Sequence, residues 1–358
     1  MQMKSNLDLL QELVSCRPVS SDIPAVNQAM LLLRDFLQAQ GVHCVLEKIG
    51  ENQVLYASTQ PGKVQDVLLN AHVDVVPAED SQFIPRVENG RIYARGVDDD
   101  LGCVVCIARI LCQKLGKSSV GAIFSADEEV GGHTTAKMIE LGYGARKLAI
   151  VMDGPNCNIA IAQKGIQIVE LIARGRGGHS SQPWSCDNPI DKLIDAYLQL
   201  RQNWPKVTAE DQWQNTMAAC ICKAGSVGNQ IPDEARMTLN FRFLSEADRQ
   251  NILTLLGQLK GVEIKADRYC QPLISDGKDP AFQIFREAIK RHFPQSDPQL
   301  VRMNGATDAR HMTSLGVPIA ISGIPGGGCH GPQEWLDLQA LEKYILVLSD
   351  VIDAISPQ

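Results

Sequence analysis

The sequence predicts an α/β protein that carries an inserted α+β domain. Short apolar runs, separated by stretches with helical spacing, are typical of the buried strands of a largely parallel sheet. The segment ARMTLNFRFL alternates instead between apolar and polar residues, which indicates a strand with one face in water. The chain of 358 residues is also long for one compact core, so two domains are expected.

The first clear element is an amphipathic helix between Pro24 and Gly41. Proline suits the first turn of a helix, and glycine suits its end. Apolar residues recur between them at spacings of four, three and four, as expected for one buried helix face: Val26, Met30, Leu33 and Leu37.

Four later apolar runs each lead to acidic or histidine residues. DVLLNA leads to His72 and Asp74, GAIFSA to Asp127, Glu128 and Glu129, KLAIVM to Asp153, and VPIAISGIPGGGC to His330. Ligands of α/β sheets bind beyond the carboxyl ends of the strands. The sequence therefore predicts that these side chains converge at one edge of the sheet.

Residues 166–272 are predicted to form the inserted domain, and residues 1–165 and 273–358 form the two parts of the α/β domain. In ARMTLNFRFL one face of the expected strand is apolar: Met237, Leu239, Phe241 and Phe243. Before it, NPIDKLIDAYLQL has the spacing of a helix with an apolar stripe: Ile190, Leu193, Ile194 and Tyr197.

Composition limits the classes of function. Hydrophobic residues make up 44% of the chain and charged residues 21%, as in ordinary water-soluble proteins. A net charge of −7 argues against a nucleic-acid-binding protein, which would need a basic face. The chain has no apolar run long enough for a membrane span, and its N-terminal sequence does not have the pattern of a secretory signal. We therefore expect neither nucleic acid nor membrane as a partner.

The eleven cysteines are scattered and odd in number, which favours a reduced, cytoplasmic protein. Cys103 and Cys106 form a CxxC pair, but this pair lies within the apolar segment LGCVVCIARIL. A buried helix face is therefore predicted there in place of a redox or metal site.

Three adjacent aspartates occupy the middle of the segment RGVDDDLG (95–102). A solvated acidic turn is the simplest interpretation, but ligand-type residues at the strand ends favour a site for two divalent metals: His72, Asp99, Glu129, Asp153 and His330. Imidazoles with carboxylates suit zinc, cobalt or manganese, and two ions ~3.5–4 Å apart can activate water and polarise a carbonyl. An aspartate that bridges two dications would turn the local repulsion into attraction.

Seven motifs give the chain a resemblance to the M20 metallopeptidase family. This family includes dipeptidases, tripeptidases, carboxypeptidase G2-like enzymes, acetylornithine deacetylases and succinyl-diaminopimelate desuccinylases. The motifs occur in the family's order: AHVDVVP (71–77), ARGVDDDLG (94–102), ADEEVGG (126–132), GHSSQP (178–183), GNQIPDEARMTLNFR (228–242), GATDAR (305–310) and HGPQEW (330–335). The resemblance implies a phosphorylase/hydrolase-like zinc peptidase domain with an inserted, ferredoxin-like lid domain that also forms a homodimer.

The resemblance also implies a role for each motif residue in a centre of two metal ions, with zinc the first choice and cobalt or manganese also suitable. The metal ligands would be His72 and Asp153 for the first ion, Glu129 and His330 for the second, and Asp99 as the bridge. Asp74 would orient His72, and Glu128 would be the general base. A cis peptide bond between Asp99 and Asp100 is implied as well.

Further roles are implied in the lid and near the end of the chain. His179 would reach the active site of the neighbouring subunit and stabilise the oxyanion. Asn229 and Arg242 match positions that hold the polar end of the substrate. For Arg310, a structural ion pair and a substrate contact remain equal alternatives.

The expected function is hydrolysis of amide bonds in small peptides, as in a dipeptidase, tripeptidase or aminopeptidase-like enzyme. The alternative is an N-acyl-amino-acid deacylase with the same machinery. Asp153 favours a peptidase, since deacylases of the family usually have glutamate there. Leu101 stands where the family often has lysine, and since that lysine is not a metal ligand, its replacement does not argue against catalysis. A catalytically inactive, amino-acid-binding relative is disfavoured, because neither a metal ligand nor Glu128 is missing.

Overall fold

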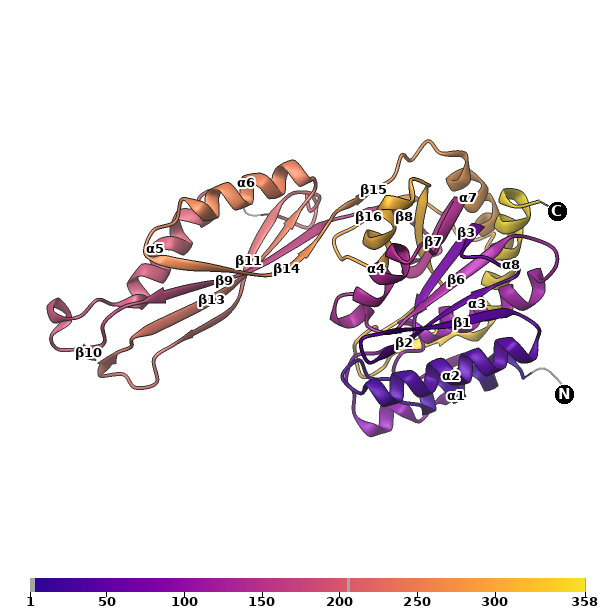
Figure 1. The fold of residues 1–358 in the computed structure, drawn as a ribbon, viewed down its shortest axis with the longest axis horizontal. Helices are drawn as coiled ribbons and strands as arrows, with labels where there is room; N and C mark the ends of the chain where they lie inside the picture. Colours follow the sequence, from indigo (N-terminus) through magenta and orange to yellow (C-terminus); the bar gives the residue numbers. More distant parts are fainter. Residues whose placement is uncertain (1–3, 205–206, 358) are drawn as a thin grey trace. The chain divides into compact units, whose positions relative to one another are not determined.

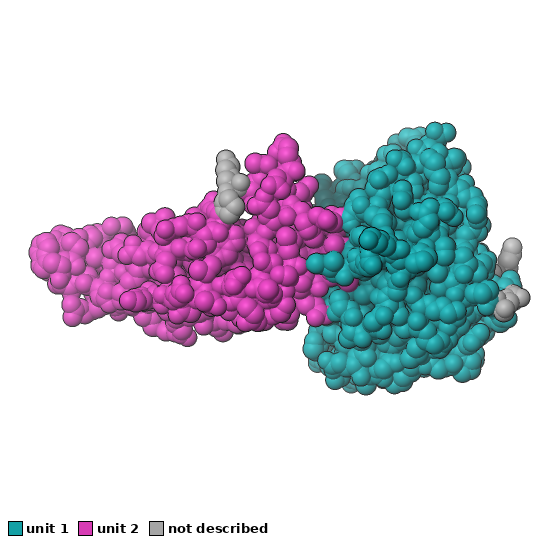
Figure 2. Space-filling view, turned by 90° about the horizontal axis from the view of Figure 1, so that it is seen from above, with its two compact units in different colours: residues 1–161, 274–301, 307–358 teal, residues 162–273, 302–306 magenta. Residues whose placement is uncertain are grey.

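The computed structural model describes residues 4–204 and 207–357, which divide into two compact units (Figure 2). The first unit comprises residues 1–161, 274–301 and 307–358, and the second comprises residues 162–273 and 302–306. The second unit is thus an insertion in the sequence of the first. Within the described residues, no helix is both long and apolar enough to cross a membrane.

A mixed sheet forms the centre of the first unit (Figure 1). Within the described ranges it has nine strands, of which β16 (Leu300–Met303) pairs with β8 off the main path. The main path runs in the order β1 (His43–Ile49), β2 (Asn52–Ser58), β6 (Val120–Ser125), β3 (Val64–His72), β7 (Gly144–Asn156), β17 (Ile319–Gly323), β8 (Ile159–Gln163) and β15 (Leu273–Ile274). The central strands β6, β3, β7 and β17 pair in parallel. They contain the four apolar runs predicted to be buried strands, so that prediction is confirmed.

Helices pack against this sheet and against one another. Their bounds are α1 (Asn6–Ser15), α2 (Ile23–Ala39), α3 (Leu101–Lys114), α4 (His133–Glu140), α7 (Pro280–His292) and α8 (Leu338–Ile355). Helix α3 packs on β3 and β6 and also contacts α1, α2 and α8. Helix α4 packs on β6 and on a 3-10 segment, η4 (Asp308–Leu315).

The helix predicted near the N-terminus is confirmed as α2. Asp22 caps its first turn by accepting a hydrogen bond from the amide of Ala25, and Pro24 lies in that turn. The four apolar residues of the predicted face are fully buried: Val26, Met30, Leu33 and Leu37. Soon after the end of the helix, Gly41 has a φ of +87°, a left-handed conformation that favours glycine. The CxxC cysteines Cys103 and Cys106 lie within α3 and are buried, also as predicted.

A small antiparallel sheet adjoins the main sheet in the first unit. Its order is β18 (Gly326–Gly327), β19 (Trp335–Asp337), β5 (Arg91–Tyr93) and β4 (Arg86–Glu88). The central pairing places Trp335 opposite Tyr93 and Asp337 opposite Arg91. As a consequence, the loop that precedes β19 lies beside the acidic loop that follows β5. A further 3-10 turn, η1 (Asp80–Phe83), precedes β4.

The second unit has a ferredoxin-like fold, as the resemblance implied. Its elements follow the order β-α-β-β-α-β typical of that fold: β9 (Gly165–Arg174), α5 (Pro189–Arg201), β11 (Thr216–Ala224), β13 (Glu234–Phe243), α6 (Glu246–Gly257) and β14 (Val262–Cys270). The sheet is antiparallel, in the order β11-β13-β9-β14, and both helices lie along the same side of it (Figure 1). Short elements complete the unit: β10 (Gly178–His179), β12 (Gln230–Ile231) and η3 (Pro183–Ser185).

The alternation predicted for ARMTLNFRFL is confirmed in β13. Its apolar face is buried: Met237, Leu239, Phe241 and Phe243. The predicted stripe of α5 is wrong at one position, because Ile194 is 47% exposed. The helix instead buries Leu193, Ala196 and Leu200, while Ile190 and Tyr197 pack partly buried against the same core, so this face includes Ala196 in place of Ile194.

Candidate metal centre

The carboxyl ends of the central parallel strands meet at one edge of the main sheet. His72 is the last residue of β3, and Asp153 lies near the end of β7. Glu128 and Glu129 follow β6 in a 3-10 turn, η2 (Glu128–Val130). Parallel pairing therefore brings together histidine and carboxylate side chains that are far apart in the sequence.

Asp99 faces a different histidine with each of its carboxylate oxygens. Its Oδ1 lies 2.9 Å from His72 Nε2, and its Oδ2 lies 3.1 Å from His330 Nε2. His330 Nε2 also lies 3.1 Å from Glu129 Oε2. The peptide bond between Asp99 and Asp100 is cis, as the resemblance implied. A carboxylate with one imidazole at each oxygen has the placement that a bridging ligand requires.

Two groups of side chains could each hold a metal ion. In each group the potential ligand atoms lie within 4.8 Å of one another. One group consists of His72, Glu128 and Asp153. The other consists of Asp99, Cys329 and His330, with the carboxylate of Glu129 beside His330. The structure thus brings the five predicted ligands and Glu128 into one region of the first unit.

Asp74 links the β3 loop to the glutamate turn. Its carboxylate is fully buried and accepts hydrogen bonds from Ser20 Oγ at 2.7 Å and from the amides of Glu128 and Glu129 at 3.0 and 3.4 Å. His72 Nδ1 lies 2.8 Å from the main-chain oxygen of Asp74 and 3.6 Å from its carboxylate. Asp74 therefore holds the imidazole mainly through its backbone, while its side chain holds the turn that carries both glutamates.

The electrostatics of the site follow from buried carboxyl groups placed close together. Burial, with the nearby Asp308 carboxylate, raises the pKa of Glu128 to about 7. Burial and the neighbouring carboxylates of Asp99 and Glu128 raise the pKa of Asp153 well above its usual range. Burial opposes ionisation of Asp99 too, but hydrogen bonds with His330 and His72 hold its pKa well below the ordinary value. Such clustering is typical of functional sites.

Comparison with known proteins identifies the family. Residues 68–354 match the sequence model of peptidase family M20/M25/M40. The chain belongs to the M20 family of metallopeptidases. It is thus a hydrolase of that family.

Individual relatives of this M20 hydrolase differ in their named activities. The chain is 24% identical to a succinyl-diaminopimelate desuccinylase from a Nitratiruptor species, over 97% of this chain and 98% of the relative. Solved structures with the same fold include the aminopeptidase PepT from Bacillus cereus, with a TM-score of 0.81 at 15% identity. Another is the M20 metallo-carboxypeptidase Sso-CP2 from Sulfolobus solfataricus, with a TM-score of 0.83 at 19% identity. Each structural match covers 99% of both chains.

The donor set fits the divalent metals that M20 metallopeptidases use. Two imidazoles and three carboxylates supply nitrogen and oxygen ligands, which suit zinc or a neighbouring transition metal. Two cations would also offset the charge of the clustered carboxyl groups, which otherwise favour the protonated form. His72 and Asp153 could hold one ion and Glu129 and His330 the other, with Asp99 between them and Glu128 left free to move a proton.

Sequence reasoning missed two residues of this centre. Glu334 is buried and accepts hydrogen bonds from the amides of Gly96, Asp98 and Asp99, at 3.0, 2.9 and 3.1 Å. Cys329 Sγ lies 2.8 Å from Asp99 Oδ2. Both occur in or beside the HGPQEW motif, so their closeness in sequence to His330 was the signal that could have found them.

Arg310 lies behind Glu128. Its guanidinium is only 3% exposed, and Nη1 lies 3.3 Å from Glu128 Oε1. Nearby, Asp308 Oδ2 accepts hydrogen bonds from the hydroxyls of Ser125 and Thr135, both at 2.6 Å. At Gly132 a Cβ atom would come within 2.0 Å of Asp308 Oδ1, so glycine is required for this close approach. Of these residues, Arg310 contacts Glu128 directly, whereas Asp308 acts on it through its charge.

The remaining predicted residues, His179, Asn229 and Arg242, lie in the second unit. His179 is exposed, and its Nδ1 lies 2.8 Å from Ser181 Oγ. Pairing of β10 with β12 brings it near Asn229, whose main-chain oxygen accepts a hydrogen bond from Ser180. Arg242 lies on the polar face of β13, where its Nε donates to Asn240 Oδ1 at 3.2 Å. The structure therefore places His179 and Asn229 together within that unit.

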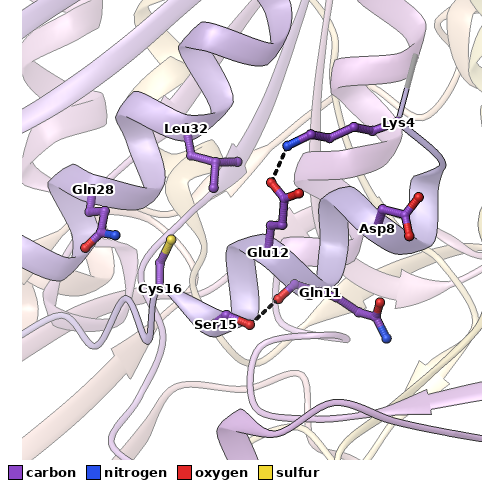
Figure 3. Close-up of a pocket in the computed structure, with 8 residues that line it drawn as sticks. All are labelled: Lys4, Asp8, Gln11, Glu12, Ser15, Cys16, Gln28 and Leu32. Carbon is purple, nitrogen blue, oxygen red and sulfur yellow. Dashed lines mark hydrogen bonds and ion pairs between the residues drawn. The ribbon is translucent and has the colours of Figure 1, made fainter. Parts of the chain in front are cut away.

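A hollow on the surface of α1 and α2 is separate from this set of residues (Figure 3). It is lined by Lys4, Asp8, Gln11, Glu12, Ser15, Cys16, Gln28 and Leu32. Lys4 pairs with Glu12 across it, and Ser15 donates to the main-chain oxygen of Gln11. None of these eight residues belongs to the metal centre.

Proposed function

We propose that this M20 hydrolase is a dinuclear zinc peptidase that cleaves small, unblocked peptides in the cytoplasm. The observation that carries the proposal is Asp99, whose two oxygens face His72 and His330 at 2.9 and 3.1 Å. A dinuclear centre needs such a bridge, with nitrogen and carboxylate ligands on both sides of it. The cytoplasmic location is supported by the eleven cysteines, all of which are free thiols.

The proposed chemistry assigns proton transfer to Glu128. Bound metal ions would supply Lewis-acid activation of the scissile carbonyl and of the attacking water. Glu128 would accept a proton from that water and pass it to the leaving amine. In the metal-free protein, burial raises the pKa of Glu128 to about 7, and a pKa near the working pH suits a group that accepts and then releases a proton. Arg310, 3.3 Å from Glu128 Oε1, would hold the carboxylate in place.

The second unit is proposed to complete the site from the partner subunit of a homodimer. His179 would donate a hydrogen bond to the oxyanion, and Asn229 and Arg242 would bind the polar end of the substrate. The exposed edge strand β11 and helix α5 support a dimer contact, because they present apolar side chains to solvent: Ile194, Leu198 and Ile221, each about half exposed.

The preference for unblocked peptides rests on Asp153. In the M20 family, peptidases tend to have aspartate at this position, whereas deacylases usually have glutamate. Carboxylates beside the first metal could hold the free ammonium of a peptide, while an acyl cap has no charge to offer them. The names of the relatives include both desuccinylases and aminopeptidases, so the substrate needs a direct test.

Matched substrates would provide that test. Alanyl-leucine and propionyl-leucine differ only in the α-amino group, so the ratio of their kcat/KM values isolates the contribution of the ammonium. We expect the zinc-loaded enzyme to prefer the dipeptide, with N-acetyl- and N-succinyl-leucine hydrolysed more slowly. A clear preference for an acylated compound would assign the enzyme to the N-acyl-amino-acid deacylases instead. The inactive Glu128→Ala variant controls for contaminating peptidases.

A further inference from the structure

Cys329 lies in the metal centre but has no role in the ligand set considered so far. It directly precedes His330, in the loop between β18 and β19. Its Sγ donates a hydrogen bond to Asp99 Oδ2 at 2.8 Å. The same oxygen lies 3.1 Å from His330 Nε2. The thiol and the imidazole therefore approach one carboxylate oxygen together.

Four potential donors converge at this point. The ligand atoms of Asp99, Cys329 and His330 all lie within 4.8 Å of one another. Glu129 adds its carboxylate, with Oε1 and Oε2 at 3.2 and 3.1 Å from His330 Nε2. Two carboxylates, one imidazole and one thiol form a four-donor set of the types that bind zinc.

The backbone of the loop holds Cys329 and His330 in this orientation. Gly328, with a φ of +76°, precedes Cys329, and Arg95 Nη2 donates to the main-chain oxygens of His330 and Gly331 at 3.1 and 3.2 Å. At Gly326 a Cβ atom would come within 2.0 Å of Asp98 Oδ1, so glycine allows the loop to approach the acidic segment. Contacts on both sides of Cys329 thus fix the loop that carries it.

We propose that Cys329 is a thiolate ligand of the second metal ion, together with Asp99, Glu129 and His330. This inference rests on the proposed dinuclear centre and extends its ligand set. On binding, the thiol loses its proton to solvent and the sulfur forms a bond to the metal. A thiolate is a soft ligand, so it makes the second site selective for zinc or cobalt over magnesium or manganese.

Cobalt spectroscopy tests the proposal without any substrate. Full-length protein loaded with two equivalents of Co²⁺ should show a near-ultraviolet thiolate-to-cobalt charge-transfer band. Cys329→Ser should lose this band, while the visible d–d bands show that cobalt is still bound. Two matched controls should keep it: Cys220→Ser, at an exposed thiol in β11, and Cys103→Ser, at a buried thiol in α3.

Metal affinity gives a second measurement. Removal of a direct ligand should weaken the second Co²⁺ site by at least ~10- to 100-fold, the range known for the loss of outer-sphere partners. A wild-type protein that binds two Co²⁺ ions without a charge-transfer band would overturn the proposal, whether or not any variant folds. If only one Co²⁺ ion binds, the dinuclear centre itself is wrong, and the role of Cys329 falls with it. A band that persists in folded Cys329→Ser or Cys329→Ala would assign the thiolate to another cysteine.

Discussion

Arg95 and Glu334 form a buried ion pair that joins the two loops of the proposed second metal site. Arg95 Nη1 lies 2.6 Å from Glu334 Oε2, and both side chains are at most 3% exposed. Glu334 also accepts from the amide of Asp99, whereas Arg95 donates to the main-chain oxygen of His330. One pair of residues therefore fixes the backbone positions of a bridging and a terminal ligand candidate.

We predict that Glu334→Ala lowers metal affinity without touching a ligand. Loss of one partner from a buried pair usually costs ~3–5 kcal/mol, because the other charge is left without compensation. The freed amides of Gly96, Asp98 and Asp99 would let the acidic loop move, so the second metal should bind ~10–100-fold more weakly. Calorimetric titration of chelated protein with zinc measures this change.

An exposed ion pair provides the control for the Glu334 variant. Arg17 and Asp80 lie 2.7 Å apart, but their side chains are 48% and 88% exposed. Asp80→Ala should therefore change stability by less than ~1 kcal/mol and leave zinc binding as it is. Equal zinc affinities for Glu334→Ala and the wild-type protein would show that the pair does not position the ligands.

The two adjacent glutamates should respond differently to substitution. Glu128→Ala is expected to remain folded and metal-loaded but to lose at least ~10²–10⁴-fold in kcat, the usual contribution of a general base. Glu129→Ala should lose metal, because its carboxylate lies beside His330 in the second group of donors. Metal content by mass spectrometry, measured with kcat, separates the two roles. If both variants kept the same metal content, the assignment of roles to this pair would be incorrect.

Much of this arrangement could be predicted because strand ends are visible in the sequence. The apolar runs before His72 and Asp153 predict two buried strands. They also predict that the residues after these strands lie at one edge of the sheet. The stripe of α5 was less accurate, since Ile194 fits a helical apolar face as well as Ala196 does, and only packing distinguishes them. Glu334 could not be found in this way, because its partners are backbone amides of a loop brought near by pairing of β19 with β5.

The metal-free protein should lose stability as the pH rises. In the folded state, burial raises the pKa of Glu128 to about 7, the hydrogen bond with Asp99 raises the pKa of His330 to about 9, and burial raises the pKa of Asp153 well above its usual range. A raised pKa means that the folded state holds the proton more tightly, so this stabilisation is complete below the unfolded pKa and is lost as the pH passes the folded pKa. The pKa of Asp99 is lowered, and its contribution is lost only in strong acid.

Thermal unfolding of chelated and zinc-loaded protein checks this prediction. The Tm of the chelated protein should fall between about pH 5 and pH 9, and zinc should raise the Tm more at the upper end of that range. Glu128→Gln removes one of the titrating groups and should flatten the fall near pH 7. A Tm of the chelated protein that stays constant or rises over this range would contradict the electrostatics described for the site.

His179 is expected to act in the active site of the partner subunit. It lies in the second unit, is exposed, and contacts Ser181 rather than a buried partner, so its imidazole is accessible to another chain. His179→Ala should lower kcat strongly and leave the metal content unchanged, since an oxyanion donor acts only during turnover.

Mixing this variant with Glu128→Ala under subunit exchange should restore activity. Half of the randomly formed dimers would then be mixed, each with one site that has both residues intact, so the mixture should reach about a quarter of wild-type activity if the sites are independent. Cys220→Ser mixed with Glu128→Ala controls for the effect of dilution by an inactive chain. Recovery should be absent when exchange is blocked by cross-linking each variant beforehand. A fully active monomer, or no recovery despite demonstrated exchange, would show that His179 does not serve the neighbouring site.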